Sequence, residues 1–531
     1  MNFLNSGKGY DLFIEEARKK FYVDKTLLID AVYRYSRENN KYICITRPRR
    51  FGKSTAANML AAFFDPSTAE ESRKLFSEMA VGALKDGQEN QLLCWTEQGK
   101  RPVIHINMIH LMPPEVESYQ DFYDELCSNL LGDLQLAYPT AEINGKMTLP
   151  KALERTGDKF IFVIDEWDAI FEMPFMTDKD KQAYILFLKA LFKDQRYVYL
   201  AYMTGILPIA KYSSGSPLNM FGEFNTFGDG IFYPWFGLTA EEIQGVMQKR
   251  ATVSPTLAEL AAWYDGYIRS ADGVHVFNPT SVSNALAEGR CRSHWTGTGP
   301  MNEVRDIIRH NVEELREDII RMVGGESLDI TLRGFSVEKT AVTTKNEILS
   351  AMVVYGFLTY HESSLSIPNY ELMLKFQEAL ASQELGLNQT IEDSKKLLKA
   401  TLAQNHAAVV RLLAQLHDEK IPFFSYHDEN SLACVITVGY LAALDTYRIK
   451  REDKAGKGYA DFTFTPMRKS DTAIILELKY GRSAKNALQC IHDRGYLGRF
   501  KDFPRVLLVG INYSEATKKH TCLTELVEKS N

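Results

Sequence analysis

The sequence predicts a multidomain α/β protein in which a parallel sheet with helices comes first, a helical and winged-helix-like region follows, and a second α/β core ends the chain. Apolar strands alternate with helical patterns in the first part, helical patterns dominate the middle, and apolar strands return near the C-terminus. A chain of 531 residues is too long for one hydrophobic core and suits two to four domains. We place the domains at residues 1–240, 241–400 and 401–531.

The composition is that of an ordinary soluble globular protein, with 45% hydrophobic and 24% charged residues. The formal net charge of −6 gives no basic surface over the whole chain, so any contact with nucleic acid must be local. Seven scattered cysteines without close pairs indicate reduced thiols. The sequence shows no secretory leader and no apolar stretch of about 18 residues, so we expect a cytoplasmic protein without membrane contact.

The stretch 41–55 has the pattern of a phosphate-binding loop (P-loop). A β-prone segment enters a basic turn, and a helical pattern starts at Ser54. In such a loop the backbone N–H groups and the helix N-terminus surround the phosphates, Lys53 contacts the β- and γ-phosphates, and the Ser54 hydroxyl binds Mg²⁺. The residues that we expect to hold ATP are Arg50, Phe51, Gly52, Lys53, Ser54 and Thr55.

Arg47 occupies the position where the standard spacing has a glycine. The alternative to a P-loop is therefore a basic surface turn that contains Gly-Lys-Ser by chance. Arg49 and Arg50 are candidate phosphate contacts, although exposed loop arginines are equally often solvated or paired.

Two later strands end in polar residues that fit the same site. An apolar run ends at Asp165 and Glu166, where Asp165 would bind Mg²⁺ beside Ser54 and Glu166 would polarise the attacking water. The alternative is acidic residues that simply end a strand. The segment 197–204 ends at Thr204, which either senses the γ-phosphate or begins a turn. We expect a long loop over 212–230 and a last strand over 231–236.

The middle of the chain is read as helices with one hairpin. Helical patterns cover 240–250, 256–264 and 280–288, and the turn-rich segment 277–281 is interpreted as packing and capping residues. A helix over 344–355 precedes a hairpin that turns at 362–364, the order of a winged-helix-like module. A helical connector runs from Tyr370 to about His417, with breaks near Gly386 and Asn388.

The C-terminal region contains a second group of ionisable residues. A hairpin centred on Lys469 would pair Asp461 with Glu477, and Lys479 would share the face of Glu477. Such a cluster suits Mg²⁺, with Lys479 orienting or deprotonating the water that attacks phosphorus. The alternative is a solvated hairpin face in which Lys479 pairs with one of the carboxylates.

Neighbouring segments add candidates to this second site. Glu429 begins an apolar helix and could supply a third carboxylate, and Gln489 lies on a helix downstream. Residues 441–531 contain 17 Lys/Arg and 11 Asp/Glu, a balance of +6 that suits contacts with phosphates.

Five motifs together resemble a bacterial family of AAA-ATPase-like proteins that carry a C-terminal nuclease domain of the PD-(D/E)XK superfamily. They are Tyr22-Val-Asp-Lys-Thr26, Arg47-Pro-Arg-Arg-Phe-Gly-Lys-Ser54, Ile164-Asp-Glu-Trp-Asp168, Met203-Thr-Gly-Ile206 and Trp263-Tyr-Asp-Gly-Tyr267, while Asp461, Glu477-Leu-Lys479 and Gln489 resemble the nuclease signature. The resemblance implies an additional-strand P-loop ATPase, a restriction-endonuclease-like core, and a position beside the nucleotide base for the segment 21–29. Arg47 departs from the general P-loop pattern but matches this family's own.

We therefore expect an ATPase coupled to a Mg²⁺-dependent nuclease that acts on nucleic acid, with DNA as the expected substrate. One rival is a nucleotide-dependent signalling or scaffold protein whose nuclease-like domain binds without cleaving. A second rival keeps the nuclease and makes the P-loop structural, because Arg47 would spoil the turn that phosphate binding needs.

Overall fold

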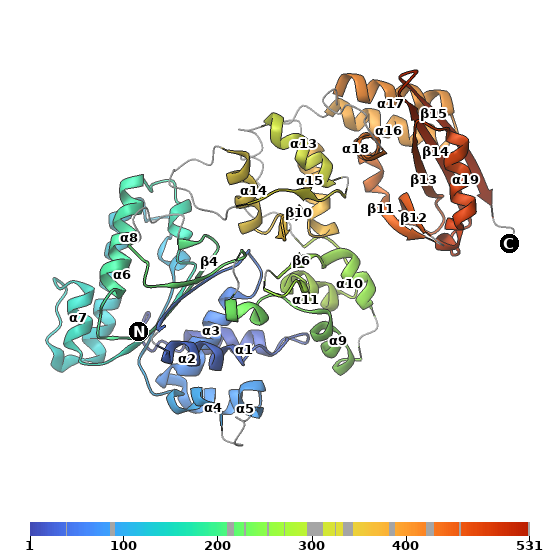
Figure 1. Cartoon of the computed structure of the whole chain (residues 1–531). Helices are drawn as coiled ribbons and strands as arrows, with labels where there is room; N and C mark the ends of the chain where they lie inside the picture. Colours follow the sequence, from blue (N-terminus) through green and yellow to red (C-terminus); the bar gives the residue numbers. More distant parts are fainter. Residues whose placement is uncertain are drawn as a thin grey trace. The chain divides into compact units, whose positions relative to one another are not determined.

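The computed structural model divides into two compact units (Figure 1). Unit 1 comprises Met1–Pro300, Ile330–Ser363 and Pro368–Glu371, and unit 2 comprises Met301–Asp329, Ser364–Ile367 and Leu372–Asn531. The structure describes all residues except 39, 85–90, 210–216, 228–229, 252–253, 270, 295–311, 324, 333–343, 382–387, 421–428, 456–457 and 529–531.

Unit 1 is built on a five-stranded sheet in the order β2-β3-β4-β1-β5, with every neighbouring pair parallel. β4 lies between β1 and β3, which is the arrangement of an additional-strand P-loop sheet. The register places Asn107 opposite Asp165, so the carboxyl ends of β2 and β3 meet at one edge. The strands are β1 Tyr42–Thr46, β2 Val103–Asn107, β3 Phe160–Asp165, β4 Val198–Gly205 and β5 Gly222–Phe224.

Helices cover both faces of this sheet, as the uninterrupted apolar strands require (Figure 1). One face packs against α1 Lys8–Ala17, α2 Leu28–Arg37 and α3 Lys53–Phe64. The other face packs against α6 Tyr119–Ala137, α7 Leu149–Arg155 and α8 Asp178–Phe192. The remaining short elements are η1 Pro66–Thr68, α4 Ala69–Ser77, α5 Ala80–Ala83, η2 Leu93–Glu97, η3 Met108–Leu111, η4 Pro139–Ala141 and η5 Ala169–Glu172.

The expected last strand over 231–236 is wrong, because that segment forms the 3-10 helix η7 Gly230–Trp235. Pro234 lies inside it and removes a backbone N–H that a strand would need. The last strand is instead β5, inside the region expected to be a loop. Phe224 of β5 packs edge-on against Phe232, with ring centroids 4.7 Å apart, so the aromatic residues fix the strand and the helix together.

The helices after residue 239 confirm the helical patterns and begin at side-chain caps. Thr239, Thr256 and Thr344 each form a capping box, and Asn278 accepts hydrogen bonds from the first N–H groups of its helix. The elements are α9 Ala240–Lys249, α10 Leu257–Tyr264, β6 Tyr267–Ile268, β7 His275–Val276, α11 Pro279–Glu288, α14 Lys345–Val354, β9 Thr359–His361 and β10 Ser364–Ser366.

The module after α14 has the helix–strand–turn–strand order that the sequence predicts. Glu362 and Ser363 form the turn and both have positive φ, 46° and 67°. Within unit 1, Ala351 and Val354 of α14 pack against Ile206 and Leu207, the two residues that follow β4. The end of β4 is therefore in direct contact with α14.

Unit 2 contains a five-stranded mixed sheet in the order β11-β12-β13-β14-β15, with β13 and β14 parallel and the other pairs antiparallel. The predicted connector is helical, and its α16 begins at Asn388, whereas Gly386 lies outside the described residues. The elements are α13 Val312–Val323, β8 Leu328–Asp329, α15 Tyr370–Ala381, which begins in unit 1, α16 Asn388–Leu402, α17 His406–Lys420, α18 Glu429–Gly439, η9 Leu441–Asp445, β11 Tyr447–Ala455, β12 Gly458–Pro466, β13 Ala473–Tyr480, α19 Ala484–Arg494, η10 Tyr496–Phe500, β14 Arg505–Ser514 and β15 Lys519–Glu528.

In the described part of the chain, no helix is long and apolar enough to cross a membrane. The six cysteines whose side chains are described are all free thiols.

Two helical glycines offer a matched test of the packing between α1 and α3. A methyl group on Gly9 would lie 2.7 Å from the Cβ atom of Ala61, whereas one on Gly132 of α6 would meet nothing within 4 Å. Gly9→Ala should therefore lower the free energy of unfolding by about 1–3 kcal/mol through overpacking. Gly132→Ala should raise it by roughly 0.5–1 kcal/mol through helix propensity. Denaturant unfolding of both variants measures the difference, and equal changes would contradict the close approach of α1 to α3.

Candidate functional site

The turn between β1 and α3 has the backbone of a phosphate-binding loop. Gly52 is the N-cap of α3 with a φ of 87°, a conformation that favours glycine. Lys53 is the first residue of the helix and is buried, and its Nζ donates to the carbonyl of Pro48 at 3.2 Å, across the loop. A Cβ atom on Gly52 would meet nothing within 4 Å, so the space over the loop is open.

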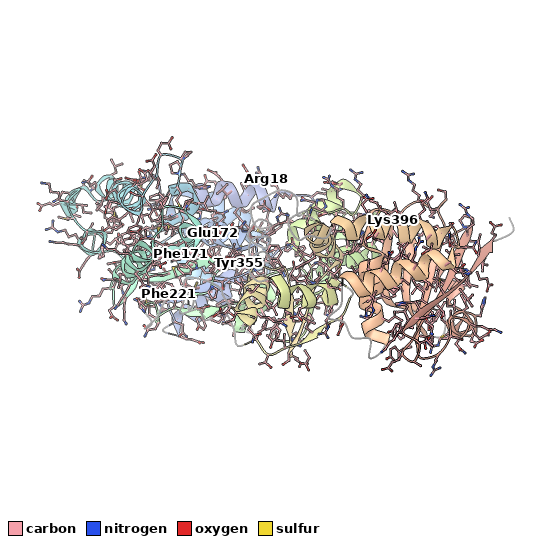
Figure 2. All side chains as sticks on the ribbon, turned by 90° about the horizontal axis from the view of Figure 1, so that it is seen from above. Arg18, Phe171, Glu172, Phe221, Tyr355 and Lys396 are labelled. Atoms are coloured by element: carbon pink, nitrogen blue, oxygen red, sulfur yellow. The ribbon has the colours of Figure 1, made fainter. Side chains whose placement is uncertain are left out.

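The three arginines of the loop are bound to the protein around it. Arg47 is buried and donates to the carbonyls of Thr46 at 2.8 Å and Phe224 at 2.9 Å. Arg49 pairs with Glu172 at 3.2 Å, a residue next to Phe171 in the segment that follows β3 (Figure 2). Arg50 donates to the carbonyl of His294 at 2.5 Å. The three arginine side chains therefore connect the loop to β5, to the segment after β3 and to His294.

Asp165 ends β3 and is 1% exposed. Its Oδ2 accepts from the side-chain amide of Asn107 at 2.9 Å, and its Oδ1 is buried without a hydrogen-bond partner among the described residues. Burial raises the pKa of Asp165 to about 6, the charge of Glu166 adds to this rise, and Ser54 and Lys53 oppose it. Ser54 therefore lies close enough to Asp165 to affect the pKa of that carboxyl, and the joint binding of Mg²⁺ by the two residues stays a prediction.

The Oγ1 of Thr204, on β4, is also buried and has no partner in the described part of the chain. Thr204 lies opposite Ile45 of β1 in the parallel register. Buried polar atoms without partners are uncommon in folded proteins and point to an absent water, ion or ligand. The donor set of a serine hydroxyl and a carboxylate fits Mg²⁺, a hard cation that prefers oxygen ligands.

The turn that follows β3 is strained and tied to β4. Glu166 has a φ of 53°, a conformation that a non-glycine residue adopts at a cost of about 1–3 kcal/mol. Asp168 accepts the backbone N–H groups of Ile206 at 3.0 Å and Leu207 at 2.6 Å, and burial raises its pKa to about 6. This role of Asp168 was not predicted, although a second carboxylate after one buried strand is a signal that the sequence contains.

A cavity of about 720 Å³ has Arg49–Ala56 and Glu166 on its wall, whereas Asp165 and Thr204 are not among its lining residues. Phe21, Tyr22 and Val23 also line the cavity. The position of this segment beside a nucleotide base, which the resemblance implies, stays a prediction. In the same part of the chain, Asp24 and Thr26 accept the backbone N–H groups of Ala80 and Val81, at the start of α5.

Another part of the cavity wall comes from α11, whose first residues were interpreted from the sequence as packing and capping residues. Asn278 does cap α11, as expected, but Thr280, Ser283 and Asn284 of that helix line the cavity. Trp235 and Leu238 add apolar surface. The spacing of the α11 residues, i, i+3 and i+4, is the signal that marks one helix face. Only the tertiary structure shows that this face meets the loop.

The second group of residues lies on β12 and β13 in unit 2. The observed pairs Phe462–Leu476, Thr463–Ile475 and Phe464–Ile474 have the register of a hairpin centred on Lys469. This register brings Asp461 to Glu477, whose Oε2 is 3.5 Å from the backbone nitrogen of Asp461. The backbone N–H of Leu478 donates to Asp461 Oδ2 at 2.6 Å.

Glu477 is 1% exposed and pairs with Lys479 at 3.2 Å. The Cys490 thiol of α19 also donates to Glu477 Oε1, at 2.9 Å. Gln489 instead donates to Asp493 at 2.7 Å on the exposed side of the helix. The helix residue that meets the carboxylates is thus one position beyond the predicted one, because the sequence does not show how α19 is rotated over β13. The side chain of Glu429 lies outside the described residues.

The chain matches two family models in the order that the motifs predict. Residues 10–214 match a family described as a predicted AAA-ATPase, and residues 427–521 match the PD-(D/E)XK nuclease superfamily. The chain therefore contains an AAA-ATPase-like domain followed by a domain of the PD-(D/E)XK superfamily.

Individual relatives are distant. The chain is 22% identical, over 537 residues and 95% of each protein, to an Azotobacter chroococcum mcd 1 protein described as an uncharacterized protein in the vnfD 5' region. The Walker-type ATPase PABY2304 of Pyrococcus abyssi is similar at 12% identity and a TM-score of 0.33, over 66% of this chain and 94% of that chain. The Aeropyrum pernix ORC2 protein is similar at 12% identity and a TM-score of 0.34, over 69% and 98%.

The raised pKa of Asp165 predicts how nucleotide binding depends on pH. A carboxyl with a pKa of about 6 is protonated below that pH and loses its attraction for Mg²⁺, whereas an ordinary aspartate would stay ionised to about pH 4. The gain in nucleotide affinity on adding Mg²⁺ should therefore shrink between pH 7 and pH 5. Calorimetry with and without Mg²⁺ measures this gain, and the same pH series with Asp165→Asn shows how much of the change comes from titration of the nucleotide itself. Asp165→Asn should have little gain at any pH, and an unchanged gain in wild type at pH 5 would refute the prediction.

The contact between Cys490 and Glu477 predicts a change in thiol reactivity. Burial and the hydrogen bond to Glu477 raise the pKa of Cys490 to about 11, so little reactive thiolate is present at pH 8. Glu477→Gln removes the charge, lowers this pKa and should speed alkylation of Cys490 by iodoacetamide several-fold, as followed by mass spectrometry. Cys522, whose pKa is raised to about 12 by burial alone, is the internal control and should not change. Equal rates for Cys490 in both proteins would rule out the contact.

Proposed function

We propose that this protein is an ATPase whose ATP cycle controls a Mg²⁺-dependent nuclease domain that hydrolyses phosphodiester bonds of nucleic acid, with DNA as its substrate. The observation that carries the ATPase proposal is the pair of buried oxygens without partners, Asp165 Oδ1 and Thr204 Oγ1, at the strand ends beside the loop. We also propose a cytoplasmic location and domains at 1–240, 241–400 and 401–531.

In the first site the chain's own groups take distinct roles. The N–H groups of Arg50–Thr55 and the N-terminus of α3 bind the phosphates, and Lys53 exchanges its contact with Pro48 for the β- and γ-phosphates. Ser54 and Asp165 would hold Mg²⁺, which neutralises charge on the phosphates when bound. Glu166 orients and polarises the attacking water, and Thr204 contacts the γ-phosphate. The apolar residues 21–23 surround the base.

In the second site Asp461 and Glu477 would hold a divalent cation, which supplies charge stabilisation at the phosphate when bound. Lys479 orients the attacking water, or deprotonates it after releasing its own proton to solvent. The water oxygen forms a bond to phosphorus, the bond from phosphorus to the leaving oxygen breaks, and the leaving oxygen takes a proton from solvent. Glu429 and Gln489 stay candidates for additional roles at this site. The supporting observation is the convergence of Asp461, Glu477 and Lys479.

A second candidate function is a nucleotide-dependent scaffold whose nuclease-like domain binds a partner or nucleic acid without cleaving it. One observation favours it: within the described ranges, no group of three or more His, Cys, Asp or Glu side chains is arranged to hold a metal ion. A single carboxylate pair with waters and substrate phosphate still suffices for Mg²⁺, which seldom binds in an all-protein cage.

Paired substitutions separate the two sites. Lys53→Ala should lower ATP affinity by at least tenfold because the phosphates lose their cation, while exposed Lys151→Ala should not change it. Asp461→Ala should abolish metal-dependent cleavage of plasmid and single-stranded substrates without lowering the melting temperature, while exposed Asp502→Ala should cleave like wild type. Binding is measured by calorimetry and cleavage on gels, with Mg²⁺ or Mn²⁺.

The same proteins also test whether ATP binding controls cleavage at the nuclease site. ATP analogues should change both the cleavage rate and the proteolytic protection of the segment 370–420. Nucleotide binding without cleavage under any condition would favour the scaffold, and cleavage that is indifferent to ATP would exclude the control of one site by the other.

A further inference from the structure

The helix α19 places two residues at the nuclease-like site on one side of the helix. Cys490 and Arg494 are four residues apart and therefore lie on the same helix face. Cys490 reaches Glu477 Oε1 at 2.9 Å, which fixes the direction in which this face points. Arg494 is one turn further along the same face and is exposed, and the charge of Glu477 acts on it.

The Arg494 side chain is held in place by neutral groups. Its Nη1 donates to the hydroxyl of Tyr496 at 2.9 Å, and that hydroxyl donates in turn to the carbonyl of Tyr459 on β12. A Cβ atom on Gly458 would lie 3.1 Å from Arg494 Cδ, so the glycine gives the arginine stem room against β12. In the part of the chain that the structure describes, Arg494 forms no salt bridge, and Tyr496 is its one hydrogen-bond partner.

The charges at this site indicate that Arg494 is suited to bind an anion. Asp461 and Glu477 contribute −2, and Lys479 and Arg494 contribute +2, so the four groups carry no net charge. Lys479 is already paired with Glu477 at 3.2 Å. Arg494 is the exposed cation, and a guanidinium presents several N–H donors in a planar fork that matches phosphate oxygens.

We propose that Arg494 is the phosphate-binding residue of this site, which holds the phosphodiester group of a nucleic acid strand beside Asp461 and Glu477. The proposal rests on the proposed nuclease function for the reaction, but phosphate binding by Arg494 can be measured without cleavage. Tyr496 is a positioning residue that orients the guanidinium. No residue of α19 other than Gln489 was connected with this site by its sequence pattern.

The test compares Arg494→Gln with Arg468→Gln in the full chain, because both changes remove one exposed positive charge from unit 2. Arg468 lies in the turn at the other end of the β12–β13 hairpin, roughly 23 Å from Asp461 along the strand at about 3.3 Å per residue. Binding of a fluorescent single-stranded DNA oligonucleotide is measured by anisotropy between 50 and 300 mM salt, with Ca²⁺ in place of Mg²⁺. Cleavage of the same oligonucleotide is measured with Mg²⁺.

Arg494→Gln should reduce the slope of log affinity against log salt by about 0.7, the value for one lost contact to a single strand. It should also lower kcat/KM for cleavage by roughly 10- to 100-fold. Arg494→Lys should restore most of the salt slope but not the rate, because a lysine keeps the charge without the planar fork. Tyr496→Phe should leave the slope unchanged and lower kcat. Arg468→Gln should stay within about twofold of wild type in cleavage.

The proposal is overturned if Arg494→Gln matches Arg468→Gln in both the salt slope and kcat/KM. Melting curves identify any loss of folding, and Arg494→Lys then decides the question, since it preserves the long cationic side chain. If wild type shows an Arg494-dependent salt slope but cleaves nothing with any metal, the nuclease proposal fails and the phosphate site stands. If wild type does not bind the oligonucleotide at all, both proposals fail.

Discussion

The architecture of unit 1 depends on the outward anchoring of its phosphate-binding loop. Three arginines fix the turn between β1 and α3: Arg47 to the carbonyl of Phe224 on β5, Arg49 to Glu172 after β3, and Arg50 to the carbonyl of His294. Ordinary P-loops rely on glycine at the first of these positions so that the backbone can turn closely. Here the turn has a glycine only at its end. The side chain of the buried Arg47 stabilises the turn instead, because it donates hydrogen bonds to carbonyl groups of two strands.

Each of the two sites contains a buried carboxyl group, and the surroundings of the two carboxyl groups differ. In unit 1, Asp165 is buried at a strand end and accepts one hydrogen bond from an amide. Its pKa is raised because burial disfavours the charged form of the carboxyl group. In unit 2, Glu477 is equally buried but is surrounded by the Lys479 ammonium and the Cys490 thiol. At the first site the charge of Lys53 offsets only part of the effect of burial on Asp165, whereas at the second site Glu477 is in direct contact with a cationic side chain of the same chain.

Local sequence patterns were sufficient to predict the position of a residue wherever that position depended on one or two neighbouring strands. The register of Asp461 and Glu477 followed from the symmetry of a single hairpin, and the positions of Asp165 and Thr204 followed from apolar runs that end in polar residues. The DNA substrate, the metal dependence and the roles of the individual site residues are still predictions, since a fold and a family do not fix them.

Sequence reasoning failed where the answer depended on packing between distant segments. An apolar run was taken for a strand over 231–236, yet Pro234 and the contacts of Phe232 make it a helix, and the edge strand β5 carries only three residues. The contact between Cys490 and Glu477 was not predicted, because the rotation of α19 about its axis is set by the core around Ile491, which includes Ala460 and Ile475. The wall formed by α11 is invisible in sequence for the same reason.

The hydrogen bonds of Asp168 connect the turn after β3 to the end of β4, which packs against α14. This carboxylate joins the strained turn at Glu166 to the N–H groups of Ile206 and Leu207, and those two side chains are packed against Ala351 and Val354 of α14. The strained turn, the end of β4 and α14 are thus connected by one unbroken path of hydrogen bonds and apolar contacts within unit 1. In the proposed ATPase, this path would connect Glu166 to the ten-residue helix α14.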